Sequence, residues 1–242
     1  MSQIWEQTRS ASAGTSAPPR QTLDRLPPLY AGLRRVVRPM LRRFFDFRVT
    51  GLEHVPENGP FILAANHANY LDGVVLSAAI SRQVVFLVMP RVYRATPLHP
   101  LFHRHVGSIP ISLARPDPGA IRRALRVLGA GGVVGIFPEG PFSRNGQLVR
   151  GQPGVALVAL HAGVPVVPAA ITGTFQALVA RRWHIPRCVP LGVRFGKALR
   201  FSGHRGRPLT QRLREDVTRR IMEEIAALLA DERRSAPTGA SR

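Results

Sequence analysis

The residues best suited to chemistry are a histidine and an aspartate at the start of an expected helix. Asn66-His67-Ala68-Asn69-Tyr70-Leu71-Asp72 follows the apolar run 61–65. Five positions on a straight helix rotate by about 140°, so His67 and Asp72 would not share a face of one helix. They can meet if His67 lies in the turn before the helix and Asp72 in its first turns. Asp72 would then hold the His67 tautomer, and His67 would deprotonate a substrate hydroxyl.

The alternative is structural, since a histidine at a helix start often only bonds to its surroundings. No serine or cysteine is placed as a nucleophile, so the attacking hydroxyl would belong to the substrate. A second acidic motif, Phe137-Pro138-Glu139-Gly140, comes later in the chain. Its Glu-Gly turn could bind a substrate opposite the His67–Asp72 pair.

The elements around these motifs alternate between strands and helices. Apolar runs predict strands over 61–65, 84–88, 107–113, 133–137 and 164–171, with one or two late strands in 192–201. Helical patterns lie over 68–80, 117–129, 155–162 and 210–230. This alternation predicts one α/β domain over 48–235, with helices on both faces of a mostly parallel or mixed sheet. Strand ends are where such folds place their sites.

The segments outside this domain differ in character. Residues 1–28 read as a disordered leader without an apolar signal core, and 236–242 as a disordered tail. Residues 29–47 predict a basic amphipathic helix with a single apolar stripe, kinked or divided at Pro39. Such a helix can lie in a membrane interface, or it can pack on the domain with its arginines in water.

The net charge is +20, and Lys197 is the only lysine. Nucleic acid, an anionic membrane or a phosphorylated substrate could each match this charge. Nucleic acid is disfavoured because aromatic residues do not alternate with the basic ones. One cysteine, Cys188, excludes an internal disulfide and a Cys-based zinc site. We read His99, His103 and His105 as solvated loop histidines, and expect no metal and no cofactor.

The motifs together resemble the glycerolipid acyltransferase family typified by 1-acylglycerol-3-phosphate acyltransferase. The resemblance lies in the order and intervals of Asn66-His67 with Asp72, then Phe137 to Gly140, then Val164-Pro165-Val166-Val167-Pro168, and it covers about Val49 to Phe201. It implies a three-layer α/β/α fold and an O-acyltransferase of phospholipid biosynthesis or remodelling. This enzyme would lie peripherally on the cytoplasmic face of a membrane.

The resemblance also implies roles for single residues. His67 would be the general base and Asp72 its partner, while Glu139 and Gly140 would line the acceptor site. The acyl donor would be a thioester, either acyl-CoA or acyl carrier protein, and the acceptor a lysophospholipid. Both donors stay open.

Two positions depart from the family pattern. Leu113 stands where the family has an arginine, with Arg115 two residues on. Phe142 replaces a second arginine, with Arg144 two residues on and Arg150 farther along. Arg144, and Arg115 or Arg150, would attract an anionic group on the substrate. The alternatives are an acceptor without phosphate, such as a glycolipid, or a catalytically silent lipid-binding protein.

Overall fold

A computed structural model describes residues 26–89, 103, 106–112, 117–178, 186–201 and 208–235. The expected tail, nearly all of the expected leader, and Leu113, Arg115, His99 and His105 lie outside these residues. His103 is within them, and it is buried, with its Nδ1 3.1 Å from the Ser108 hydroxyl. The prediction of a solvated His103 is therefore wrong, because Ser108 contacts both its ring, through the hydroxyl, and its carbonyl, through the amide at 2.9 Å.

In the described ranges, seven strands form one sheet in the order β1-β7-β6-β2-β5-β3-β4. β2, β3, β4, β5 and β6 run parallel, while β7 is antiparallel to β6, and β1 is parallel to β7. The bounds are β1 (Arg48–Thr50), β2 (Phe61–Ala65), β3 (Val84–Val88), β4 (Ile109–Pro110), β5 (Val133–Ile136), β6 (Val166–Thr172) and β7 (Gly192–Phe195). The sheet is therefore mixed, and its central strand β2 is buried along its whole length.

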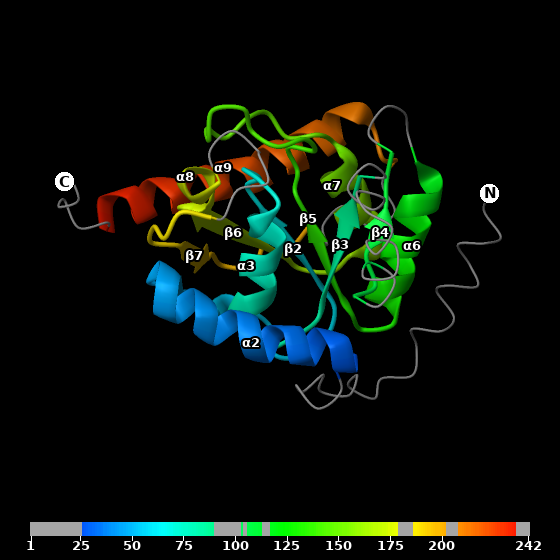
Figure 1. Cartoon of the computed structure of the whole chain (residues 1–242). Helices are drawn as coiled ribbons and strands as arrows, with labels where there is room; N and C mark the ends of the chain where they lie inside the picture. Colours follow the sequence, from blue (N-terminus) through cyan, green and yellow to red (C-terminus); the bar gives the residue numbers. More distant parts are fainter. Residues whose placement is uncertain are drawn as a thin grey trace.

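Helices cover both faces of this sheet (Figure 1). Their bounds are α2 (Pro28–Phe45), η2 (Leu52–His54), α3 (Leu71–Ala79), α6 (Pro118–Gly129), α7 (Gly154–Ala162), α8 (Thr174–Ala177) and α9 (Gln211–Ser235). Phe61, Leu63 and Ala65 join a core beneath α2 and α3, whereas Ile62 and Ala64 join a second core beneath α6, α7 and α9. This alternation follows from the two-residue period of a strand, and it confirms the three-layer α/β/α prediction.

Most predicted elements are present with shifted ends. The helix expected over 68–80 begins at Leu71, and the last helix extends to Ser235. The strand expected over 107–113 is reduced to Ile109–Pro110 within the described residues. Asp117 does cap α6, where its side chain accepts a hydrogen bond from the Ala120 amide at 2.9 Å. β1, η2 and α8 were not predicted, since each is only three or four residues long.

α2 differs from its prediction in two ways. It is one helix that continues through Pro39, so the expected division is wrong. Its apolar stripe is also covered on one side only, while the adjoining side is exposed. Tyr30, Leu41 and Phe45 are buried. A second set is exposed, and we call it the outer stripe: Leu29 (46%), Leu33 (40%), Val36 (67%), Met40 (43%) and Phe44 (55%). None of the helices in the described ranges is long and apolar enough to cross a bilayer.

Candidate active site

The two acidic motifs meet because the strands that precede them are neighbours. β2 ends at Ala65 and leads into His67, and β5 ends at Ile136 and leads into Glu139. β2 and β5 pair in parallel, with Ala64 opposite Ile136, so both motifs leave the same edge of the sheet. β6 pairs with the other side of β2. The strands that follow β2 are thus added on both of its sides. The site lies at the carboxyl ends of the central strands, at this switch in strand order.

His67 and Asp72 form a hydrogen-bonded pair, as the spacing predicted. His67 lies in the turn before α3, Asp72 lies in the first turn, and His67 Nδ1 is 2.9 Å from Asp72 Oδ2. The same Oδ2 accepts hydrogen bonds from the amides of Ala68 at 2.6 Å and Asn69 at 2.8 Å. The Asp72 side chain is 0% exposed and that of His67 is 12% exposed. A carboxylate at a helix N-terminus also interacts favourably with the helix dipole.

This arrangement determines which imidazole nitrogen carries the proton. Asp72 Oδ2 already accepts two amide hydrogen bonds, so it acts as an acceptor toward Nδ1 as well. In the neutral imidazole, Nδ1 is then the protonated nitrogen and Nε2 keeps its lone pair. His67 is thus oriented to accept a proton through Nε2.

Aromatic rings enclose the imidazole. The Phe137 ring stacks on it, with centroids 3.8 Å apart and 5° between the planes. Phe142 lies tilted against it at 4.3 Å, and Tyr70 meets the edge of Phe142 at 4.6 Å. Tyr70 is half exposed. Phe142, which stands at a position of family arginine, therefore packs directly on the candidate base.

Glu139 lies beneath this group and is 1% exposed. Its Oε1 accepts the His67 amide at 2.7 Å, and its Oε2 accepts the Val149 amide at 3.0 Å. Burial raises the pKa of the Glu139 carboxyl above its ordinary value of 4.5, whereas the two amide hydrogen bonds act in the opposite direction. The expected contact of Glu139 with an acceptor stays a prediction, since both oxygens bond to the main chain here.

Two asparagines that the sequence analysis did not single out hold the His67 loop to β6 and α8. The Asn66 side chain donates to the Ile171 carbonyl at 2.9 Å and accepts from the Ile171 amide at 2.7 Å. The Asn69 side chain donates to the Thr174 carbonyl and accepts from the Leu71 amide at 2.8 Å. Polar residues directly after a buried strand were the available signal. Their partners lie about a hundred residues away, beyond the reach of local patterns.

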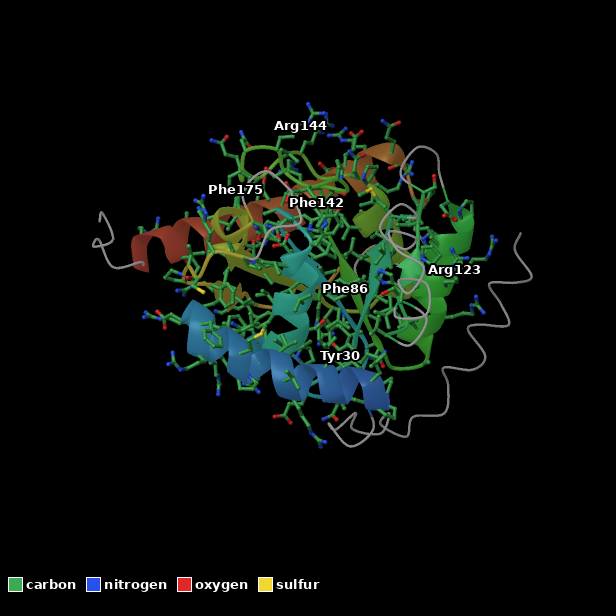
Figure 2. All side chains as sticks on the ribbon, viewed as in Figure 1. Tyr30, Phe86, Arg123, Phe142, Arg144 and Phe175 are labelled. Carbon is green, nitrogen blue, oxygen red and sulfur yellow. The ribbon has the colours of Figure 1, made fainter. Side chains whose placement is uncertain are left out.

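The remaining candidates lie on the turn after β5. Gly140 closes it, with its amide 3.0 Å from the Phe137 carbonyl and a φ of +80°, which favours glycine. Arg144 and Arg150 are exposed. Figure 2 shows Arg144 at the outer rim of the molecule, with Phe142 nearer the amino end of α3. Within the described part of the chain, the hydrogen bonds and ion pairs of His67 and Asp72 involve neither arginine. Among the described residues, no group of three or more potential metal ligands occurs.

The fold and this pair define a three-layer α/β/α protein with a buried, hydrogen-bonded His–Asp pair at its strand ends. The chain belongs to the Acyltransferase family, whose model matches residues 46–172, more than half of the 242 residues. This match includes His67, Asp72 and the Glu139 turn. The predicted family is thereby confirmed.

Named relatives agree with this assignment. The chain is 26% identical over 127 residues to the 1-acyl-sn-glycerol-3-phosphate acyltransferase of Bacillus subtilis, covering 52% of this chain and 62% of that protein. It is 29% identical over 136 residues to the chloroplastic 1-acyl-sn-glycerol-3-phosphate acyltransferase of Arabidopsis thaliana, covering 54% of this chain and 37% of that one. The chain thus spans less than two thirds of the length of either relative.

The fold is similar to the crystal structure of the 1-acyl-sn-glycerophosphate acyltransferase PlsC from Thermotoga maritima. The TM-score is 0.65 at 22% identity, over 82% of this chain and 80% of that chain. At this identity the likeness supports the fold alone.

Proposed function

We propose that the protein is an O-acyltransferase of phospholipid biosynthesis. It would move a fatty acyl chain from an acyl thioester, either acyl-CoA or acyl carrier protein, to a hydroxyl of a lysophospholipid-like acceptor. The observation that carries this proposal is the His67–Asp72 pair, with Nδ1 held at 2.9 Å and Nε2 left to take a proton. The named relatives support a 1-acylglycerol-3-phosphate type of acceptor.

The proposed reaction needs no nucleophile from the protein. His67 Nε2 takes the proton of the acceptor hydroxyl as its oxygen attacks the thioester carbonyl. The tetrahedral intermediate collapses, the carbon–sulfur bond breaks, and the thiolate leaves. The imidazolium returns its proton to that sulfur, so the products are an ester and a thiol. Asp72 stabilises the imidazolium while it exists.

The direct test is product formation by purified protein in mixed micelles. Acyl-CoA and acyl carrier protein would be offered with lysophosphatidic acid, lysophosphatidylcholine, monoacylglycerol and a glycolipid, and the products identified by mass spectrometry. A reaction without protein gives the blank. A new ester together with released thiol supports the proposal. Neither product with either donor, from protein shown to be folded, would overturn it in favour of a lipid-binding protein.

A second candidate for the acceptor has its own observation. Phe142 offers no hydrogen-bond donor, and its ring lies against the His67 imidazole at 4.3 Å. A phosphate site depends on charge-assisted, often bidentate contacts from arginine. An acceptor without a phosphate monoester beside its hydroxyl would fit this aromatic surface better than lysophosphatidic acid. The acceptor series above separates the two.

We also propose that α2 attaches the protein peripherally to an anionic membrane surface, on the cytoplasmic side. The outer stripe presents exposed apolar side chains, and the exposed Arg35, Arg42 and Arg43 flank it. The net charge of +20 supports the same partner. Each arginine near such a surface contributes about 1 kcal/mol.

Co-sedimentation with phosphatidylglycerol-containing vesicles tests this attachment. Val36→Glu with Phe44→Glu should reduce the bound fraction about tenfold or more, because two charges enter the apolar stripe. The matched control adds the same two charges at exposed positions away from α2, Leu52→Glu on η2 and Gln211→Glu on α9. Equal binding by the α2 variant and the control would contradict the proposal.

A further inference from the structure

The carboxylate of Glu139 is engaged entirely by the main chain. Oε1 accepts the amide of His67 at 2.7 Å and Oε2 the amide of Val149 at 3.0 Å, and the residue is 1% exposed. We infer that Glu139 is a positioning residue, which fixes the backbone of His67 and does not contact the acceptor. This inference rests on the proposed function, in which His67 is the base.

Substrate contact by Glu139 would be costly. Hydrogen bonds from amides to a carboxylate are charge-assisted and roughly twice as strong as neutral ones. To turn toward the acceptor, the side chain would leave two part-buried amides without their acceptors, and leaving such groups unpaired is unfavourable. The carboxylate thus already holds two backbone amides before any substrate binds, and contact with an acceptor would break these hydrogen bonds.

The turn that carries Glu139 also bonds to the carbonyl of His67, in the next peptide unit. The Ser143 amide donates to the His67 carbonyl at 2.8 Å. Phe137, at the start of this turn, stacks on the imidazole at 3.8 Å. The 137–143 turn therefore contacts the amide, the carbonyl and the ring of His67. Asp72 holds Nδ1 from the α3 side, so the base is fixed from two independent elements.

Glu139 further ties this turn to the segment that follows. Besides the Val149 bond, the Gln152 amide donates to the Pro138 carbonyl at 2.7 Å, and the Ser143 hydroxyl donates to the Gln147 carbonyl at 2.6 Å. The segment 147–152 thus forms a brace behind the turn. A brace of this kind matters because a misplacement of about 1 Å can reduce a rate by about a hundredfold.

Glu139→Gln is the sharpest variant. It preserves the shape of the side chain, but its amide nitrogen is a donor, so it cannot accept from both His67 and Val149. Glu139→Asp keeps the charge but shortens the reach, and provides the second variant if Glu139→Gln does not fold. Glu53→Gln, an exposed glutamate on η2, is the matched control.

Two readouts test the inference, and one needs no turnover. Amide hydrogen exchange should be at least about tenfold faster at His67 or Val149 in Glu139→Gln, since one hydrogen bond is lost. In the acyl-transfer assay, kcat should fall about 10- to 100-fold, with the KM for the acceptor changed by less than about twofold. Glu53→Gln should leave both readouts unchanged.

The opposite pattern would overturn the inference. Unchanged exchange at both amides, or an acceptor KM raised about tenfold with kcat preserved, would assign Glu139 to substrate binding. If the unsubstituted protein transfers no acyl group, the proposed function fails separately. The exchange result then still decides whether Glu139 holds the His67 backbone.

Discussion

The imidazole of His67 lies parallel to the ring of Phe137, with 5° between the planes and 3.8 Å between the centroids. Phe137 is the first residue after β5, and Phe86 on β3 stacks on it in turn at 5.6 Å. The orientation of the candidate base thus depends on β5, which lies beside β2, and on β3, which lies beside β5. An imidazole supported on its face cannot rotate freely about its side-chain bonds.

Replacing Phe137 should therefore affect the chemical step. We expect Phe137→Leu to lower kcat about tenfold, because an offset aromatic contact contributes about 1 kcal/mol and its loss frees the ring. The acceptor KM should stay nearly constant. Steady-state kinetics on the variant measure both. A raised KM with unchanged kcat would instead place Phe137 against the substrate.

Asp72→Asn should be nearly inactive. The asparagine oxygen can take the position of Oδ2, which alone makes the contacts to Nδ1 and to the Ala68 and Asn69 amides, but the negative charge that stabilises the imidazolium is lost. A reduction in kcat of about 10²- to 10⁴-fold is expected. Circular dichroism and urea unfolding would control for stability, which should fall by about 1–3 kcal/mol because charge-assisted hydrogen bonds become neutral ones. Activity within tenfold of the original protein would remove Asp72 from the mechanism.

Phe142 should determine acceptor choice. Phe142→Arg places a guanidinium near His67, and we expect it to shift relative kcat/KM toward lysophosphatidic acid over monoacylglycerol by about tenfold or more. Phe142→Leu is the control, since it removes the ring without adding charge. Competition between the two acceptors in one reaction measures the ratio. An equal shift with leucine would show that the ring, and not the missing charge, determines the preference.

Ionisation of the Glu139 carboxyl should make the free energy of unfolding depend on pH. Because burial raises its pKa in the folded protein above the ordinary 4.5, the folded state binds this proton more tightly than the unfolded chain. Its contribution is therefore full below pH 4.5 and declines as pH rises through the raised pKa. The free energies of unfolding of the original protein and of Glu139→Gln can be measured in urea across pH 4 to 8. The stability of the original protein relative to the variant should decline as pH rises. A difference independent of pH would contradict this.

Local pattern predicts much of this fold but not how its parts combine. The apolar run 61–65 and the turn after it were sufficient to place His67 before α3 and Asp72 within it, because strand and helix ends carry strong local signals. The alternation of elements likewise predicted the layers. β7 was expected as a strand, yet its antiparallel pairing with β6 depends on a connection that periodicity does not describe.

The exposure of the α2 apolar residues and the burial of Glu139 depend on tertiary packing, which local sequence does not describe. The apolar residues of α2 satisfied one helical stripe in sequence, but only one side packs on α3 and the sheet, which leaves Val36 and Phe44 exposed. Nothing in the local sequence distinguishes a Glu139 that contacts a substrate from a Glu139 that accepts hydrogen bonds from backbone amides. Its burial follows from the pairing of β2 with β5, which brings the His67 amide to its carboxylate.

The most direct test of the account is the rate of acyl transfer by His67→Ala under saturating donor and acceptor. His161→Ala, a change at an exposed histidine on α7, is the matched control. If His67 is the general base, we expect a rate at least about 10²-fold lower for His67→Ala and an unchanged rate for His161→Ala. Acyl transfer by His67→Ala at the rate of the unsubstituted protein would contradict the assignment of His67 as the general base.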